Sequence, residues 1–310
     1  MALLFRAIND KAEDWRRALT AEIPDLDFRV WPDHVGNPDD VDMALVWKMP
    51  PGGFKPFRKL KAIFSLGAGV DHVFLDPELP EGAVVTRLVD PWMARAMSES
   101  ALLAVLRFHR LAPDYARQQA EGVWRHLATP HTDQCPVGVL GLGTLGQDAA
   151  AKLAALGFPV LGWSRTAKSV PGVTCFHGEA QLGAFLERTR ILICLLPLTP
   201  ATDGIIDAKL LARLPQGACV VNLARGGHVV EEDLLAALDS GHIAGAALDV
   251  FRVEPLPADS PFWRHHKVII TPHSAADTNF ATAAAQIAEN IRRVRDGRPP
   301  LNIVDRDQRY

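Results

Sequence analysis

The feature that most constrains this sequence is a glycine pattern that directly follows an apolar run. Residues 137–140 read Val-Gly-Val-Leu, and Gly141, Gly143 and Gly146 follow in the order G-x-G-x-x-G before an alanine-rich stretch. A strand, a tight glycine turn and a helix in this order begin a βαβ unit. The first glycine makes the turn, the second lets a pyrophosphate approach the backbone, and the third lets the helix pack closely on the strand. The pattern predicts an α/β fold that binds a dinucleotide.

The helix predicted after this turn supports the same interpretation. Its N-terminus presents N–H groups and the positive end of the helix dipole to phosphate groups. A lone G-x-G-x-x-G is weak evidence, and a purely structural turn is the alternative, but here the pattern lies between a strand and a helix. All six turn residues are expected to contact the cofactor: Gly141, Leu142, Gly143, Thr144, Leu145 and Gly146.

The end of the next predicted strand indicates which dinucleotide binds. NAD is usually held at this place by an acidic residue on its ribose hydroxyl. This chain instead has Ser164, Arg165 and Thr166, with Lys168 close behind and no acid. A guanidinium can pair with a 2′-phosphate through charge-assisted hydrogen bonds, and the two hydroxyls can donate to it. We therefore expect NADP(H) to be preferred and NAD(H) to be possible, with a solvated basic turn as the alternative.

Short apolar segments alternate with helical patterns along nearly the whole chain, which predicts parallel βαβ units. The length of 310 residues favours two domains of ordinary size. Strands are expected at 3–8, 27–30, 44–47, 62–65, 83–86, 137–140, 160–163, 190–195, 218–223, 244–250 and 268–270, and helices at 11–20, 92–117, 144–156, 229–240 and 277–295. Pro113 is expected to kink or interrupt the helical pattern at 92–117.

Composition excludes several classes of partner. The formal net charge is −3, from 33 basic and 36 acidic residues, which gives no reason to expect nucleic acid. No apolar run approaches the ~20 residues that cross a bilayer, and the first residues lack the basic region of a signal peptide. The four cysteines fit no zinc-binding pattern. We expect a cytoplasmic protein with no metal site, no membrane partner and no nucleic-acid partner.

Three ionisable residues follow three predicted strands of the second series: Arg225, Glu254 and His273. Ligands of open parallel sheets bind beyond the carboxyl ends of the strands, so these side chains can converge on one crevice. A guanidinium suits the carboxylate and carbonyl of a 2-oxo acid. A histidine can protonate the oxygen that becomes negative as hydride reaches the carbonyl carbon. A carboxylate on the other ring nitrogen favours imidazolium and orients the ring. Alone, each residue is more often structural; together they predict a reductase.

Five segments carry a resemblance to the D-2-hydroxyacid dehydrogenase family, and within it to the glyoxylate/hydroxypyruvate reductase A subgroup: 139–146, 195–200, 222–227, 248–255 and 271–274. The resemblance covers nearly the whole chain. It implies a Rossmann-type doubly wound NAD(P)-binding domain at 98–286, inserted into a smaller flavodoxin-like α/β substrate-binding domain formed by 1–97 and 287–310. It also implies a homodimer, whose contact we expect along residues 92–117 and 122–136.

The same resemblance implies roles for individual residues. Arg225 would anchor the substrate, and Glu254 would support His273 as the proton donor. Asp249 matches a position that helps to hold the nicotinamide carboxamide, and Ser274 stands where many relatives have glycine. The implied cofactor contacts beyond the glycine turn and Ser164–Thr166 are Leu196, Pro197, Thr202, Leu223, Ala224, Arg225, Asp249, His273 and Ser274.

A second glycine-containing turn, Gly67-Ala68-Gly69, follows the predicted strand at 62–65. Its small residues let backbone N–H groups face an anion, although an ordinary tight turn is the alternative. In the family this loop binds the substrate carboxylate. Trp47 ends the preceding strand and would limit the pocket to a small acid, with a core tryptophan as the alternative. His72 is expected to be structural or exposed.

The sequence thus predicts NADPH-dependent reduction of glyoxylate or hydroxypyruvate to glycolate or D-glycerate. One alternative is a dehydrogenase for a larger 2-oxo acid such as phenylpyruvate, which the pocket around Trp47 would decide. Another is a dinucleotide-sensing binding protein without enzymatic activity. The complete set of Arg225, Glu254 and His273 favours an enzyme.

Overall fold

Two parallel sheets organise the chain, and each belongs to a separate unit. The computed structural model describes residues 1–8 and 10–310. Unit 1 comprises Met1–Met93 and Thr278–Tyr310, and unit 2 comprises Ala94–Asp277. The second boundary falls earlier than the expected 286/287, because the whole of helix α9 (Phe280–Arg295) packs along helix α1 (Ala12–Glu22) of unit 1. The first boundary, expected at 97/98, falls at 93/94. No helix in the described part of the chain is long and apolar enough to span a membrane.

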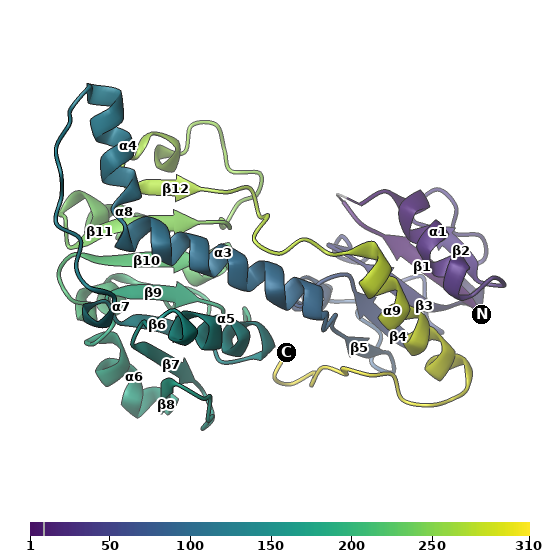
Figure 1. Ribbon diagram of the computed structural model, residues 1–310. Helices are drawn as coiled ribbons and strands as arrows, with labels where there is room; N and C mark the ends of the chain where they lie inside the picture. The colour runs from purple at the N-terminus through teal and green to yellow at the C-terminus, as the bar shows by residue number, and fades with distance from the viewer. Residues whose placement is uncertain (9) are drawn as a thin grey trace. The chain divides into compact units, whose positions relative to one another are not determined.

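Unit 2 is built on a seven-stranded sheet with the order β12-β11-β10-β9-β6-β7-β8, and all its pairings are parallel (Figure 1). This is the Rossmann order with one further edge strand, as predicted. The order reverses between β6 and β9, which is where such sheets bind ligands. The strands are β6 (Val137–Leu140), β7 (Val160–Ser164), β8 (Val173–His177), β9 (Ile191–Cys194), β10 (Ala218–Asn222), β11 (Ile243–Leu248) and β12 (Val268–Ile270).

The central strands of this sheet are apolar throughout because both faces are covered. In β9, Leu192 belongs to one buried cluster, whereas Ile191 and Ile193 belong to the cluster on the other face. A strand buried on both faces shows a continuous apolar run rather than an alternating one. The helices of unit 2 are α3 (Pro91–His109, which starts in unit 1), α4 (Ala112–Glu121), α5 (Thr144–Ala155), α6 (Gly178–Leu186), α7 (Ala208–Arg213) and α8 (Glu231–Asp239).

The helical pattern at 92–117, which Pro113 was expected to kink or interrupt, forms two helices, α3 and α4. Leu111 has a φ of +57°, in the left-handed region, and Pro113 lies in the first turn of α4. Proline has no N–H to donate and its ring clashes with the preceding turn, so it is tolerated at the start of a helix but not inside one. The break therefore has a local cause that the sequence already contains.

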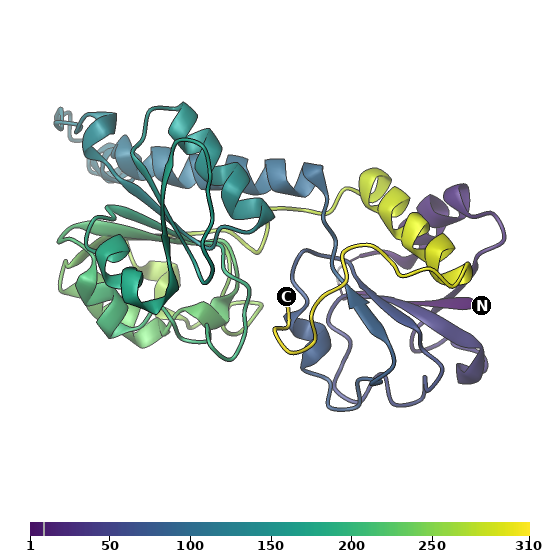
Figure 2. The same cartoon turned by 90° about the horizontal axis from the view of Figure 1, so that it is seen from below.

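Unit 1 contains a five-stranded parallel sheet with the order β2-β1-β3-β4-β5, the flavodoxin-like order that was predicted. Helices α1 and α9 lie side by side (Figure 1, Figure 2). The C-terminal segment runs antiparallel along β5 through a bridge between Thr86 and Ile303. The other elements of unit 1 are β1 (Ala2–Arg6), β2 (Asp27–Val30), β3 (Val41–Val46), β4 (Ala62–Ser65), β5 (Val84–Thr86), α2 (Asp71–Phe74) and the 3-10 turn Pro38–Asp40. The 3-10 turns Thr132–Gln134, Gly226–His228 and Pro261–Arg264 belong to unit 2.

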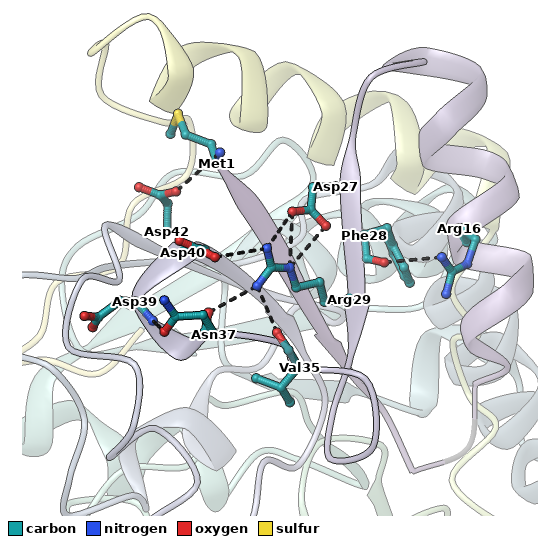
Figure 3. Close-up of polar contacts among 10 residues, drawn as sticks. All are labelled: Met1, Arg16, Asp27, Phe28, Arg29, Val35, Asn37, Asp39, Asp40 and Asp42. Carbon is teal, nitrogen blue, oxygen red and sulfur yellow. Dashed lines mark hydrogen bonds and ion pairs between the residues drawn. The ribbon is translucent and has the colours of Figure 1, made fainter.

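An arginine on the edge strand β2 holds the loop that follows it (Figure 3). The Arg29 guanidinium bonds both carboxylate oxygens of Asp27, pairs with Asp40 at 3.5 Å, and donates to the carbonyls of Val35 and Asn37. The hydrogen bond from Arg29 holds the pKa of Asp27 below its usual value. The network places charged side chains on an edge strand, where they disfavour pairing with a further strand.

Candidate active site

The glycine turn lies at the end of β6, beside the end of β9. Gly141 has a φ of +111°, and a Cβ there would lie 2.8 Å from the Leu195 carbonyl. A Cβ on Gly146 would overlap the carbonyl oxygen of Gly141. The fold itself therefore requires glycine at both positions, one for the turn and one for close helix packing.

The middle glycine of the turn differs from the other two. A Cβ on Gly143 would meet no described protein atom within 4 Å, so protein packing does not require glycine there. Gly143 is exposed and is the N-cap of α5, and no side chain caps this helix. An open approach to uncapped N–H groups at the N-terminus of a twelve-residue helix fits a pyrophosphate group.

The residues after β7 form an exposed basic turn. Arg165, Thr166 and Lys168 are exposed, and Ser164 is buried. The Ser164 hydroxyl donates to the Thr166 carbonyl at 2.8 Å and so shapes the turn. The charge and the exposed hydroxyl at this place fit a phosphate, and they are supplied by Arg165 and Thr166.

The loop after β10 holds Arg225 through its backbone. The side chain of Asn222, fully buried at the end of the strand, donates to the Arg225 carbonyl at 2.9 Å and accepts from the Ala224 N–H at 3.2 Å. The Arg225 guanidinium donates to the Ala224 carbonyl at 2.7 Å and is partly exposed. Asn222 thus fixes the path of the chain that carries the arginine.

A buried histidine links this loop to the one after β9. Both nitrogens of His228, whose side chain is fully buried, face carbonyl oxygens: Nδ1 lies 3.0 Å from that of Arg225 and Nε2 lies 3.2 Å from that of Pro197. Burial opposes the charged form, but the nearby Cys194 and these two carbonyls outweigh it and raise the pKa of His228. The Pro197 carbonyl also accepts from the Thr202 hydroxyl at 2.7 Å. Two predicted cofactor contacts, Pro197 and Thr202, therefore share one network with Arg225.

Gly226 brings the Arg225 loop against the loop after β11. A Cβ on Gly226 would overlap the carbonyl group of Phe251 and the amide nitrogen of Arg252. The chain that leads to Glu254 therefore passes directly over the residue next to Arg225. Only glycine permits this approach.

Asp249, which is 2% exposed, shapes the loop that carries His273. Its carboxylate accepts from the Thr271 hydroxyl, from the Ser274 N–H at 2.9 Å and from the Ala275 N–H at 3.0 Å, while its backbone carbonyl accepts from the His273 N–H at 2.7 Å. These bonds surround His273, whose φ of +54° is unusual for a residue other than glycine. The carboxylate thus has a structural task that the sequence did not predict.

His273 and Glu254 lie together as the sequence predicted. His273 Nδ1 lies 2.9 Å from Glu254 Oε2, and the side chains are 33% and 21% exposed. The other oxygen of Glu254 accepts from the Phe251 N–H at 3.1 Å, which orients the carboxylate. Because Nδ1 faces Glu254, we expect Nε2 to be the ring nitrogen that exchanges a proton with a substrate.

In unit 1, the predicted anion-binding turn follows β4. Gly67 is buried, and a Cβ on it would lie 2.8 Å from the ring of Trp47. Trp47 therefore packs on the turn and is partly exposed, so it is not an ordinary core residue. Ala68 and Gly69 are partly exposed, and within residues 1–8 and 10–310 their N–H groups donate to no other protein group. His72 was expected to be structural or exposed; it is buried, so exposure is the wrong alternative.

Comparison with known proteins now identifies the family. The model of the D-isomer specific 2-hydroxyacid dehydrogenase NAD-binding domain matches residues 102–275. A curated relative, "Glyoxylate/hydroxypyruvate reductase A" of Serratia proteamaculans (strain 568), is 45% identical over 300 residues, 95% of each chain. The chain belongs to the D-isomer specific 2-hydroxyacid dehydrogenase family.

Two solved structures of family members are similar over the whole chain. One is a D-isomer specific 2-hydroxyacid dehydrogenase from Xanthobacter autotrophicus Py2 in complex with NADPH and MES, with 48% identity, a TM-score of 0.95 and coverage of 100% of this chain and 99% of that one. The other is an NADPH-dependent glyoxylate/hydroxypyruvate reductase from Sinorhizobium meliloti in complex with NADP and sulfate, with 38% identity, a TM-score of 0.92 and full coverage of both chains. The predicted family and fold class are confirmed.

Sequence reasoning missed the buried polar residues that hold this family site together. Asn222 lay within a quoted motif but was given no role, and neither Ser65 nor His228 was singled out. A spacing of three residues links Asn222 to Arg225 and Arg225 to His228, a local signal that was available. The bond from His228 to Pro197 spans 31 residues, and no local pattern announces it.

Proposed function

We propose that this protein reduces small 2-oxo acids, glyoxylate and hydroxypyruvate, to glycolate and D-glycerate with NADPH. The observation that carries the proposal is the 2.9 Å pair of His273 Nδ1 and Glu254 Oε2 in the same unit as the dinucleotide turn. The names of the relatives from Serratia proteamaculans and Sinorhizobium meliloti support the substrate class.

The reaction requires a hydride, a proton and an oriented carbonyl group. Bound NADPH supplies the hydride to the carbonyl carbon. Imidazolium of His273 donates its Nε2 proton to the carbonyl oxygen, which becomes the product hydroxyl. Glu254 accepts from Nδ1–H throughout and stabilises the positive charge before the proton leaves. Arg225 binds the carboxylate and the carbonyl oxygen, and its positive charge stabilises the charge that develops on that oxygen.

The cofactor is proposed to bind through its phosphates to the turn at Gly141–Gly146. Gly143 leaves space for the pyrophosphate, and the uncapped N-terminus of α5 donates N–H groups to it. Arg165 and Thr166 pair with the 2′-phosphate, and the NADPH and NADP complexes of similar proteins support this choice. The further proposed contacts are Leu142, Thr144, Leu145, Leu196, Pro197, Thr202, Leu223, Ala224, Asp249 and Ser274.

Unit 1 is proposed to contribute to binding the same substrate. The N–H groups of Ala68 and Gly69 donate to its carboxylate, and Gly67 lets the chain turn there. Trp47 packs on this turn and limits the length of the substrate side chain. A short acid such as glyoxylate is therefore favoured over phenylpyruvate.

A panel of 2-oxo acids tests the proposal, with NADPH and NADH compared for each. We expect turnover with glyoxylate and hydroxypyruvate, a higher kcat/KM with NADPH, and little activity with phenylpyruvate. His273→Ala is expected to reduce kcat by about 100-fold or more, the contribution of a general acid. Preference for phenylpyruvate would favour the larger-acid alternative. NADPH binding without turnover of any acid would favour a sensor. Undiminished activity of His273→Ala would refute the assigned proton donor.

We also propose that the protein is a cytoplasmic homodimer. Large apolar side chains are exposed on α3, on α4 and in the segment after α4: Leu103, Leu106, Tyr115 and the fully exposed Trp124. Clustered exposed apolar groups are typical of a protein interface. Light scattering after gel filtration is expected to give twice the mass of 33.8 kDa, and a lower mass for Trp124→Glu at the same concentration. A monomeric wild-type protein would refute this proposal.

A further inference from the structure

A chain of hydrogen bonds joins the end of β4, the segment after β3 and helix α2 to the proposed carboxylate-binding turn of unit 1. The Lys48 N–H donates to His72 Nδ1 at 3.2 Å, and His72 Nε2 lies 3.2 Å from Ser65 Oγ. Ser65 Oγ donates to the Gly69 carbonyl at 2.8 Å and accepts from the Gly67 N–H at 3.2 Å. Ser65 ends β4, Lys48 follows β3, and His72 lies in α2. We call these four bonds the Ser65–His72 relay.

The donor and the acceptor in each bond of the relay follow from the bond between the Lys48 N–H and His72 Nδ1. A backbone N–H can only donate, so Nδ1 of His72 accepts and carries no proton. The neutral ring then carries its proton on Nε2 and donates it to Ser65 Oγ. The Ser65 hydroxyl in turn donates a hydrogen bond to the Gly69 carbonyl. Every donor in the relay meets an acceptor, so the arrangement is self-consistent without any charge on the ring.

This direction of hydrogen bonding excludes a nucleophilic role for Ser65. A nucleophilic serine needs a ring nitrogen that accepts its proton. Here the ring donates to the serine, and Ser65 is only 2% exposed. Ser65 and His72 therefore have a structural role, which is to hold neighbouring groups of the turn in place.

The relay fixes both ends of the turn that presents the Ala68 and Gly69 N–H groups. Ser65 holds the Gly67 N–H on one side and the Gly69 carbonyl on the other. The ring of His72 also packs edge-on against that of Trp47, with 4.6 Å between centroids. One buried histidine thus positions the turn and the tryptophan that packs on it.

We propose that Ser65 and His72 are positioning residues for recognition of the substrate carboxylate, an inference that rests on the proposed function of this turn. Without the relay, the turn can adopt other conformations in which its N–H groups no longer converge on one anion. The loss falls on binding of the acid, whereas the dinucleotide turn belongs to the other unit.

The test uses Ser65→Ala, His72→Asn and the double variant, with glyoxylate as substrate and oxalate as a competitive inhibitor. Each single variant is expected to raise the KM for glyoxylate and the inhibition constant for oxalate by about tenfold, the weight of one hydrogen bond to a charged group. The KM for NADPH is expected to stay within about twofold. Because both variants break the same relay, the double variant is expected to be no worse than the poorer single one.

Val85→Ala is the matched control, because it shortens a buried side chain of the same sheet that takes no part in the relay. It is expected to lower the melting temperature without raising either constant for the acid. Wild-type protein that does not turn over glyoxylate would refute the proposed function. Wild-type turnover with unchanged constants in the variants, additive effects in the double variant, or an equal rise in Val85→Ala would instead refute the relay. If Ser65→Ala does not fold, His72→Asn decides, since it breaks the same link from the other side.

Discussion

Replacing Gly226 with alanine tests whether close backbone contact keeps Arg225 and Glu254 in register. The new Cβ would overlap three backbone atoms of Phe251 and Arg252, none of which can rotate away. Restoring the 3.0 Å separation below which Cβ atoms are essentially never found requires a shift of about 1 Å between the two loops, and a displacement of that size near reacting groups costs about 100-fold in rate. We therefore expect kcat/KM for glyoxylate to fall by about 100-fold, or about 2.7 kcal/mol of transition-state stabilisation.

The neighbouring glycine supplies the matched control for this experiment. A Cβ on Gly227 would meet the Cδ atoms of Leu198 at 2.9 and 3.0 Å and an oxygen of Asp203 at 3.2 Å, all at the ends of side chains that can move. Gly227→Ala is expected to keep kcat/KM within about threefold of wild type. Steady-state rates are measured well below the melting temperature of each variant, so that unfolding does not contribute. A folded Gly226→Ala variant with kcat/KM similar to that of Gly227→Ala would refute the reasoning.

Three further predictions concern charge. Glu254→Gln keeps an acceptor for His273 Nδ1–H but removes the charge that stabilises imidazolium, so kcat is expected to fall about 100-fold with little change in KM for glyoxylate; an unchanged kcat would contradict the role of the carboxylate. Arg165→Ala is expected to raise the KM for NADPH about tenfold and to leave that for NADH within about twofold, measured side by side; equal effects on both would remove the 2′-phosphate assignment. Because Arg29 lowers the pKa of Asp27, their pair stabilises the fold above the usual aspartate value of 3.8 and loses this effect as pH falls through the lowered pKa. Arg29→Ala is expected to cost at most about 1 kcal/mol near neutral pH, since the pair is partly exposed, and the difference in melting temperature from wild type is expected to shrink in acid.

Strands could be predicted from sequence wherever their burial produces a continuous apolar run. The run at 137–140 is buried on both faces and was predicted with its observed bounds. The edge strand β8 (Val173–His177) was missed because its residues are only partly buried and include polar side chains, so no continuous apolar run marks it. Its absence from the prediction did not alter the fold class, because the order of the other strands already defines the Rossmann sheet.

Site residues could be predicted from sequence where their chemistry follows from the residue type and from a position at the end of a strand. His273 and Glu254 were predicted as a pair, and the structure brings them to 2.9 Å. The task of Asp249 was not accessible, because its partners Thr271, Ser274 and Ala275 lie more than twenty residues further along the chain. A carboxylate in a strand-end motif looks the same in sequence whether it faces a ligand or a neighbouring loop.

The precision of the site resides in buried polar side chains more than in the groups that carry the chemistry. Asn222, His228 and Asp249 are at most 2% exposed, whereas His273 and Glu254 are 33% and 21% exposed. A buried polar group that loses its partner costs about 1–3 kcal/mol, so each alternative path of these loops is penalised even before a ligand binds. The partly exposed His273 and Glu254 can be reached by solvent, while the backbones that carry them are held by buried hydrogen bonds. Pre-organisation in this protein therefore comes largely from side chains that are buried among the loops of the site.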